Sequence, residues 1–186
     1  GPLVTALAAG NRVMIKMPEV TPFTNAVLKK MLAEVFDEDL VAVVGEELQD
    51  PNVFTSLPFN HIVFTGSPAV GRIVMRSAAE NLTPVTLELG GKSPALVTRN
   101  YPVDDVAKRI THGKAANCGQ ICVAPDYALV PRERVADFVA GVKRTFGRFY
   151  DNQTAGNADY TAIVNERQHQ RVNALLEDAR AKGALV

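Results

Sequence analysis

The sequence HIVFTGSPAVGRIVMRSAAE, residues 61–80, sets a short strand, a tight turn and an amphipathic helix in immediate succession. Residues 61–65 combine β-branched and aromatic side chains, which favour a strand. The turn at residues 66–68, GSP, supplies a serine that suits a helix N-cap and a proline that suits the first helical position. Apolar residues then recur at helical spacing along one stripe, at Val70, Ile73, Val74 and Ala78. A strand that leads through a glycine turn into a helix is the repeating unit of α/β proteins.

The same alternation of strands and helices continues on both sides of this stretch. The strands that we expect span residues 12–16, 40–44, 61–65, 84–89, 95–98 and 127–130. The helices that we expect span residues 3–9, 22–36, 68–80, 103–116, 132–146 and 165–182. Residues 147–160 are polar, and we expect a loop there. The pattern predicts an α/β protein with a largely parallel sheet.

The composition is that of an ordinary globular protein. Of 186 residues, 47% are hydrophobic and 22% are charged, which provides for one domain or parts of two. Twenty basic side chains offset twenty acidic ones, so the charge gives no indication of a nucleic-acid or membrane partner. No apolar run approaches the roughly 20 residues of a membrane span. Two cysteines are too few for a disulfide scaffold, and we expect a cytoplasmic protein.

Both ends of the chain look incomplete. Gly1 leads directly into the first expected helix, and residues 184–186 begin an apolar run that stops. A strand left there would be an unprotected sheet edge. We therefore expect the chain to be a fragment of a larger polypeptide.

Two cysteines stand four residues apart in NCGQICVAPDY, residues 117–127. A disulfide between Cys118 and Cys122 needs Cα atoms within about 7 Å, which the spacing does not settle. A zinc site that recruits His112 has at most three ligands at unusual spacing, which disfavours it. Free cysteines are often buried and inert, whereas a thiolate beside Gly119 and backbone N–H groups is a nucleophile placed to meet a carbonyl. These residues alone leave both alternatives open, and they do not assign a nucleophile to either cysteine.

Three further positions carry polar groups that suit a ligand or a reaction. Glu88 ends an extended segment between two leucines, either as a surface residue or as a partly buried general base. Residues 66–71 offer the N–H groups and positive dipole of a helix start to a phosphate, but no Lys-Ser/Thr follows, which disfavours a P-loop. Lys16 and Glu19, just past a strand, are placed to hold ribose hydroxyls, since ligands of open α/β sheets collect at that edge. Each position is equally compatible with an ordinary structural or solvated role.

Four stretches, in this order, resemble the aldehyde dehydrogenase superfamily. They are GNRVMIKMPEVTP (10–22), FTGSPAVG (64–71), TLELGGKSP (86–94) and NCGQICVAPDY (117–127). The combination of ELGGK with N-x-G-Q-x-C is the specific part, and its glutamate and cysteine have the family's separation. The resemblance covers nearly the whole chain. It is strongest to the class 3 branch, which includes bacterial coniferyl aldehyde dehydrogenases.

The resemblance implies an NAD(P)-dependent oxidation of an aldehyde to its acid. Cys122 aligns with the family's nucleophile, which forms a thiohemiacetal and, after hydride leaves to the nicotinamide, a thioester. Glu88 aligns with the base that activates water to hydrolyse the thioester. The implied cofactor contacts are Lys16 and Glu19 at the adenosine ribose, Ser67 at the pyrophosphate, Val70 at the adenine, and the glycines Gly66 and Gly71 around them. A carboxylate at Glu19 favours NAD without excluding NADP, since it repels a 2′-phosphate. No metal is implied.

The resemblance also predicts how the chain is organised. Residues 1–87 would be the later part of a Rossmann-like NAD(P)-binding domain with a parallel sheet, and residues 88–186 the first part of an α/β catalytic domain, so that the fold is truncated at both ends. The family's upstream oxyanion asparagine and downstream ribose-binding glutamate lie outside the chain. Because losing one oxyanion donor costs roughly 10²–10³ in turnover, we expect the isolated fragment to be weakly active or inactive. For the full-length protein we expect a homodimer and a small-molecule aldehyde, such as the aromatic coniferyl aldehyde.

Two alternatives remain beside the aldehyde dehydrogenase. A CoA-acylating semialdehyde dehydrogenase passes its acyl group to CoA rather than to water, and Glu88 speaks against it because it would need no base for water. A nucleotide-binding module without catalysis belongs to a different class. An activated thiolate at Cys122 would separate the enzyme from the module, since it reacts with iodoacetamide near neutral pH.

Overall fold

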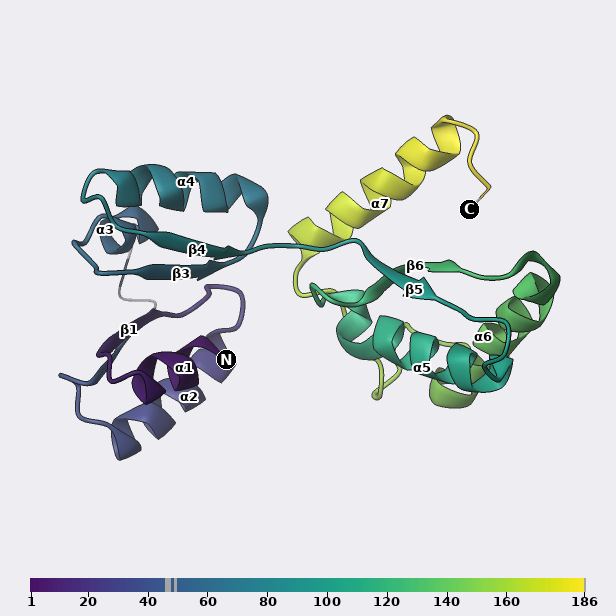
Figure 1. Ribbon diagram of the computed structural model, residues 1–186, viewed down its shortest axis with the longest axis horizontal. Helices are drawn as coiled ribbons and strands as arrows, with labels where there is room; N and C mark the ends of the chain where they lie inside the picture. The colour runs from purple at the N-terminus through teal and green to yellow at the C-terminus, as the bar shows by residue number, and fades with distance from the viewer. Residues whose placement is uncertain (46–47, 49, 186) are drawn as a thin grey trace. The chain divides into compact units, whose positions relative to one another are not determined.

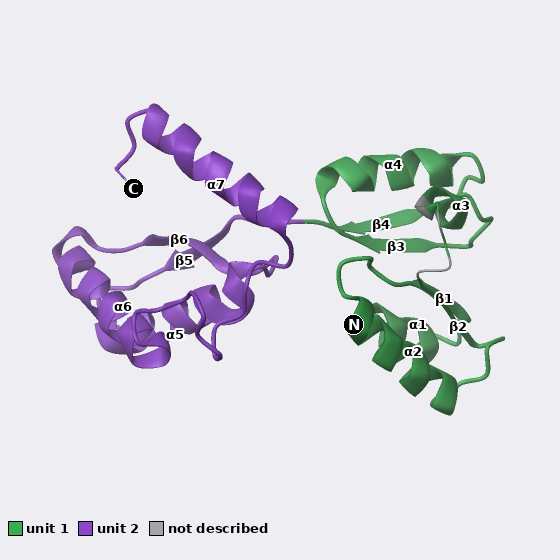
Figure 2. Cartoon of the chain, turned by 180° about the vertical axis from the view of Figure 1, so that it is seen from behind, with its two compact units in different colours: residues 1–89 green, residues 90–186 purple. Residues whose placement is uncertain are grey.

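The computed structural model describes residues 1–45, 48 and 50–185 of the chain (Figure 1). It divides into two compact units, residues 1–89 and residues 90–186, shown in different colours in Figure 2. Helices alternate with strands in both units, and every strand pair in the described residues is parallel. This confirms the predicted α/β class. None of the helices in the described part of the chain has the length and apolar character needed to cross a membrane.

The first half of unit 1 is built on one parallel strand pair. It contains α1 (Pro2–Ala8), β1 (Val13–Lys16), α2 (Pro22–Val35) and β2 (Val41–Val44). Parallel strands need a long crossover, and α2 supplies it between β1 and β2. Asn25 of α2 is buried, and its Nδ2 donates to Pro18 O at 2.6 Å. The loop that follows β1 is thereby fixed to the start of α2.

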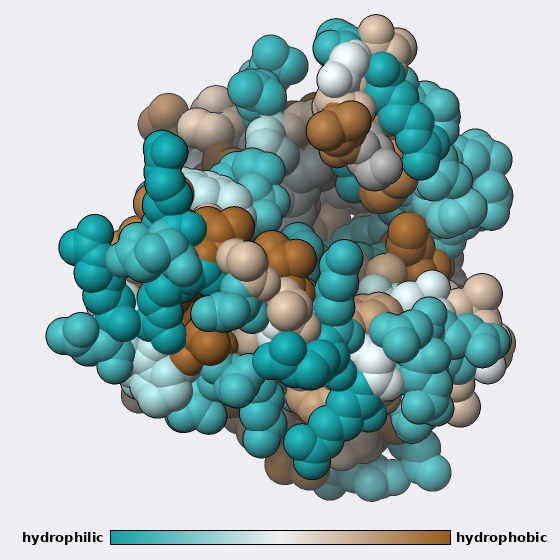
Figure 3. Space-filling model, turned by 90° about the vertical axis from the view of Figure 1, so that its right-hand side faces the viewer, coloured by the Kyte–Doolittle hydropathy of each residue, from teal (hydrophilic) through white to brown (hydrophobic). Residues whose placement is uncertain are grey.

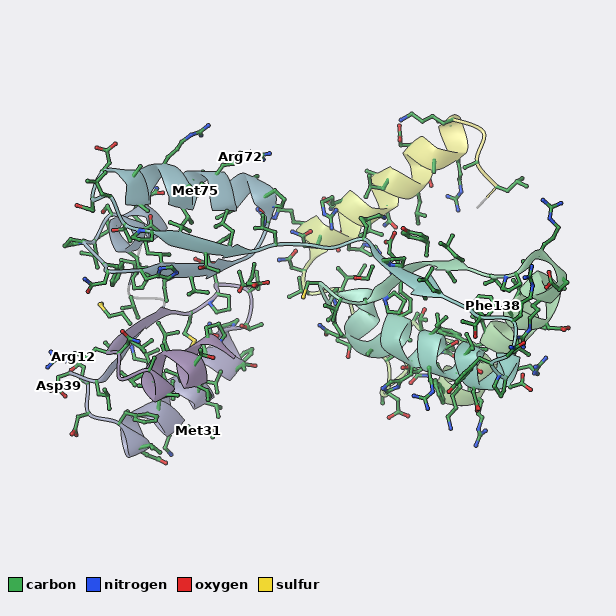
Figure 4. All side chains as sticks on the ribbon, in the orientation of Figure 1. Arg12, Met31, Asp39, Arg72, Met75 and Phe138 are labelled. Atoms are coloured by element: carbon green, nitrogen blue, oxygen red, sulfur yellow. The ribbon has the colours of Figure 1, made fainter. Side chains whose placement is uncertain are left out.

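The second half of unit 1 contains the strand, turn and helix predicted for residues 61–80. Its elements are α3 (Pro51–Thr55), β3 (Ile62–Thr65), α4 (Pro68–Ala79) and β4 (Val85–Glu88). Strands β3 and β4 pair in parallel, and α4 packs on them through a core of Ile62, Val74 and Ala78. Arg72 lies on the opposite face of α4, turned away from the strands (Figure 4). The sequence pattern did not predict α3, which is only one turn long and begins at an Asp50 cap.

Unit 2 places two helices against its own parallel strand pair. Its elements are β5 (Ser93–Leu96), α5 (Val103–Ala115), the 3₁₀ turns η1 (Ala116–Gly119) and η2 (Arg132–Arg134), β6 (Pro125–Leu129), α6 (Val135–Tyr150) and α7 (Glu166–Ala181). Strand β5 pairs with β6, and α5 packs closely against α6. A Cβ at Gly141 of α6 would lie 2.8 Å from the Ala107 Cβ, so only a glycine allows this approach. Figure 3 shows apolar side chains that reach the surface among hydrophilic ones.

Three predicted boundaries in unit 2 were wrong. We expected residues 147–160 to form a loop, but α6 continues to Tyr150. Asp151 caps the helix with a left-handed φ of 51°. The tyrosine belongs to an aromatic cluster with Phe146 and Tyr160, which explains why the helix persists. The strands expected at 95–98 and 127–130 instead begin two residues earlier, each with a proline inside or at its start.

Candidate active site

The loop after β1 brings together the two side chains predicted to hold a ribose. Lys16 is the last residue of β1, and its Nζ donates a hydrogen bond to Glu19 Oε1. This hydrogen bond, more than any other contribution, lowers the pKa of the Glu19 carboxyl below its usual value. The carboxylate is 69% exposed, so its remaining lone pairs face solvent. An ion pair at the carboxyl end of a parallel strand offers both a donor and an acceptor to a hydroxyl-bearing ligand.

The turn between β3 and α4 holds the predicted pyrophosphate position. The Ser67 Oγ accepts a hydrogen bond from Val70 N at 3.3 Å, which confirms the predicted N-cap. Gly66 N donates to Glu88 O at 3.0 Å, so the turn is joined to the end of β4. The helix start therefore has a defined position at the carboxyl edge of the strand pair.

Gly71 and Val70 determine how the first turn of α4 packs and what it presents to solvent. A Cβ at Gly71 would lie 3.3 Å from Leu89 Cδ2 and 3.4 Å from Leu87 Cδ1, so the missing side chain lets α4 lie close to the end of β4. Val70, predicted to face an adenine, is 44% exposed and presents an apolar surface beside the turn. Of the predicted residues, Gly66, Ser67 and Val70 are exposed on unit 1, whereas Gly71 is buried beneath them.

Glu88 lies at the same edge of the strand pair as this turn. It is the last residue of β4 and is in register with Thr65, the last residue of β3. Its side chain is exposed.

Cys122 lies in unit 2, on a loop with an unusual backbone. Asn117, Cys118 and Gly119 have consecutive left-handed φ values of 51°, 55° and 71°. Asparagine and glycine accept this conformation, whereas cysteine pays a steric cost. The chain then turns through residues 121–124, where Ala124 N donates to Ile121 O at 3.0 Å. The Cys122 side chain on this turn is exposed, Cys118 is half-buried, and both are free thiols.

A glutamine side chain fastens this loop to a distant part of unit 2. The Gln120 Nε2 donates to Asn117 O at 2.9 Å and to Ala162 O at 3.1 Å. The Gln120 Oε1 accepts from Val164 N at 2.9 Å. Asn117 Nδ2 donates a hydrogen bond to Gln120 O at 3.2 Å, which links these two residues within the loop.

The ELGGK segment meets the cysteine loop directly. A Cβ at Gly91 would lie 2.5 Å from the Cys122 carbonyl oxygen, so a glycine is needed for this contact. The next residue, Lys92, forms a salt bridge of 2.5 Å with Asp126, which follows the cysteine loop. The parallel pairing of β5 with β6 extends the contact between the segments that follow Gly91 and Cys122. Residues 90–92 of the ELGGK motif and the cysteine loop are therefore neighbours within unit 2.

One hollow of unit 2 lies away from the cysteine loop. It has a volume of about 860 Å³ and is lined by the carboxyl ends of β5 and β6 and by α6, including Phe138 (Figure 4). Cys122 precedes the opposite end of β6 and does not line it. In the described part of the chain, no group of three histidine, cysteine or acidic side chains is arranged to hold a metal ion.

The structure brings some of the predicted site residues together, and it shows two further residues that support the cysteine loop. Lys16 with Glu19, and the 66–71 turn with Glu88, form two groups within unit 1, and Cys122 belongs to unit 2. Sequence reasoning missed the roles of Gln120 and Gly91. The doubled glycine of ELGGK was a signal for a close backbone approach. The partners of Gln120 carry no signal, because they are backbone atoms more than forty residues away.

Comparisons with known proteins bear on the whole chain. A probable coniferyl aldehyde dehydrogenase from Pseudomonas aeruginosa is 58% identical over 184 residues, which cover 99% of this chain and 38% of that protein. Aldehyde dehydrogenase family 3 member A2 from Macaca fascicularis is 43% identical over 95% of this chain and 36% of its own length. The crystal structure of a Mycobacterium tuberculosis aldehyde dehydrogenase complexed with NAD⁺ matches with a TM-score of 0.82 and 32% identity, over 98% of this chain and 39% of that one.

These matches confirm the predicted resemblance, including its class 3 character. The chain spans about 38% of the length of two coniferyl aldehyde dehydrogenase relatives that it matches. The family match itself extends over residues 1–186. The chain belongs to the aldehyde dehydrogenase family.

Proposed function

We propose that the protein containing this chain oxidises an aldehyde to a carboxylic acid with NAD(P), and that Cys122 is its nucleophile. The observation that carries the proposal is the exposed Cys122 thiol on a loop that Gly91 contacts at its backbone. Cys118, by contrast, is half-buried beside Tyr160. Family membership supports the same assignment, because the resemblance of residues 117–122 to the N-x-G-Q-x-C motif implies a nucleophile at Cys122.

The chemistry assigned to this chain has two stages. The Cys122 thiolate attacks the aldehyde carbon, and the Cys122 backbone N–H stabilises the resulting oxyanion of the thiohemiacetal. NAD(P), when bound, supplies the acceptor for the hydride that leaves this carbon. The acyl group is then a thioester on Cys122. Glu88 takes a proton from water, the hydroxide attacks the thioester carbonyl, and the acid leaves as the thiol is restored.

The residues of unit 1 fit a dinucleotide. The ion pair of Lys16 with Glu19 offers a donor and an exposed acceptor for ribose hydroxyls. The Ser67 turn presents the amino end of a twelve-residue helix to a phosphate, where the helix dipole favours negative charge. Glu19 repels a 2′-phosphate, which supports NAD as the preferred cofactor. The NAD⁺ complex of the Mycobacterium tuberculosis relative supports the same cofactor class.

We assign the two parts of the chain to two functions. Residues 1–87 belong to the cofactor-binding domain and residues 88–186 to the catalytic domain. The division of the chain after Leu89 supports a boundary close to this position. The names of the Pseudomonas relatives support an aromatic aldehyde such as coniferyl aldehyde as the substrate.

Aldehyde-dependent NADH formation by the intact protein tests the proposal. Cys122→Ala is expected to abolish turnover, because no other group forms the thioester, whereas Cys118→Ala is the matched control and should retain it. Wild-type turnover in Cys122→Ala would reject the mechanism. Product analysis with added CoA separates the hydrolytic reaction from a CoA-acylating one, which would yield an acyl-CoA in place of the acid.

A further inference from the structure

We propose that Gln120 is a positioning residue for the Cys122 nucleophile, because its side chain fastens the cysteine loop to residues 162–164. The inference rests on the proposed role of Cys122 and deepens it. It assigns the orientation of the thiol to an amide that is two residues away and does not touch the substrate.

Both the nitrogen and the oxygen of the Gln120 side-chain amide form hydrogen bonds. Its nitrogen donates to Asn117 O at 2.9 Å, inside the loop, and to Ala162 O at 3.1 Å, outside it. Its oxygen accepts from Val164 N at 2.9 Å. A glutamine amide has two N–H donors and one carbonyl acceptor, so all of its groups are engaged. One side chain therefore links two backbone segments that have no strand pairing with each other.

The loop needs such a fastening because its own backbone is strained. Asn117 tolerates its left-handed φ, but the same conformation costs Cys118 roughly 1–2 kcal/mol. Strain of this kind persists only where surrounding contacts hold it. Only Gly119 separates Gln120 from Cys118, and only Ile121 separates it from Cys122. A shift of Gln120 is therefore transmitted to the thiol.

A second contact fixes the same loop to the same segment. The Tyr160 side chain neighbours the Cys118 thiol, and burial together with this thiol raises the pKa of the Tyr160 hydroxyl to about 12. Tyr160 is held in turn by ring contacts with Phe146 and Tyr150 of α6, at centroid distances of 6.1 and 4.9 Å. Residues 160–164 are thus attached to the helix framework of unit 2 and serve as a fixed base. Gln120 is the member of this arrangement nearest in sequence to Cys122.

The test compares Gln120→Ala with the unsubstituted protein in the absence of cofactor. Iodoacetamide labelling of Cys122, resolved from Cys118 by peptide mass spectrometry, is followed from about pH 6 to about pH 9.5. We expect the Cys122 profile to change by at least about fivefold in its limiting rate, since misplacement by about 1 Å is costly for a reactive group. Hydrogen exchange at the Val164 amide should accelerate as its acceptor is lost. Gln153→Ala is the matched control, because the Gln153 amide donates only to the nearby Ala155 O at 2.8 Å.

Gln120→Glu provides a second variant if the alanine variant does not fold. It retains an acceptor for Val164 N but loses the N–H donors, so we expect the Val164 amide to remain protected while the Cys122 profile still changes. An unchanged Cys122 profile in a folded variant would overturn the proposal, even if Val164 exchange accelerates, because Gln120 would then be only a structural contact. Equal inertness of both thiols in the unsubstituted protein would instead show that the proposed nucleophile is wrong, and the inference would end with it.

Discussion

Gly91 has no side chain at a place where the backbone of the nucleophile loop comes closest. A Cβ there would lie 2.5 Å from the Cys122 carbonyl oxygen, and this backbone atom is not the flexible end of a side chain. Gly91→Ala must therefore move one of the two segments. We expect a stability loss of about 1–3 kcal/mol, typical of overpacking, and a loss of about tenfold or more in aldehyde oxidation by the intact protein.

Gly90→Ala is the matched control for this prediction. A Cβ at Gly90 meets no heavy atom within 4 Å in the part of the chain that the structure describes, and its φ is not left-handed. We expect its activity within about twofold of the unsubstituted protein, because an exposed substitution without contacts usually costs little. Urea unfolding and NADH formation measure both variants. Equal effects of the two substitutions would contradict a special role for the Gly91 contact.

Tyr160 titrates unusually late because of its surroundings. Burial, and then the neighbouring Cys118 thiol, raise its pKa from 10.0 to about 12. The neutral hydroxyl therefore stabilises the fold fully below pH 10, and this contribution is lost as the pH rises through about 12. In an absorbance titration of the four tyrosines we expect one late step, which Tyr160→Phe removes. Tyr127→Phe should leave that step in place, and a late step that survives in Tyr160→Phe would refute the assignment.

Helix α5 carries a polar group that its packing does not satisfy. Thr111 is 4% exposed, and its Oγ1 finds no hydrogen-bond partner among the residues that the structure describes. Replacing the hydroxyl with a methyl group of similar shape removes this desolvation cost, and valine has a similar helix propensity. We expect Thr111→Val to raise the free energy of unfolding by about 1 kcal/mol.

Thr83→Val is the contrasting variant. Thr83 is also buried, at 7% exposed, but its Oγ1 donates to Phe59 O at 2.9 Å. Loss of this bond leaves a buried carbonyl unpaired, which costs about 1–3 kcal/mol. Denaturant titration of both variants should therefore give shifts of opposite sign. Destabilisation by both would mean that Thr111 has a partner in solution, such as a water molecule.

Elements with local causes were predictable from the sequence, and elements with distant causes were not. The Ser67 cap and the amino end of α4 follow from three adjacent residues, and the structure confirms both. The last turn of α6 depends on ring contacts with Tyr160, ten positions beyond the end of the helix, and the prediction missed it. The same reasoning applies to the candidate site. Only the family resemblance points to Cys122, and the acceptor and donor groups around Gln120 are backbone atoms that no side-chain pattern reports.

The molecule separates its candidate functions between its two units. The proposed cofactor residues and Glu88 lie in residues 1–89, and the proposed nucleophile lies in residues 90–186. Each group also has its own local supports. The Lys16–Glu19 pair depends on the loop fixed by Asn25, whereas Cys122 depends on the loop fixed by Gln120. This separation means that cofactor binding and thiol reactivity can be altered one at a time.

Two variants of the intact protein examine this independence. Lys16→Met removes a charged donor, and hydrogen bonds to charged groups contribute about 1.5–3 kcal/mol, so we expect NAD to bind at least about tenfold more weakly. Alkylation of Cys122 without cofactor should stay within about twofold, because the contacts that hold its loop come from Gly91, Ala162 and Val164 of unit 2. Cys122→Ser should show the reverse pattern, with aldehyde oxidation lost and the NAD dissociation constant nearly unchanged. If either variant altered both cofactor binding and thiol chemistry to a similar extent, the two groups would be coupled, and residues 1–89 and 90–186 could not be assigned separate tasks.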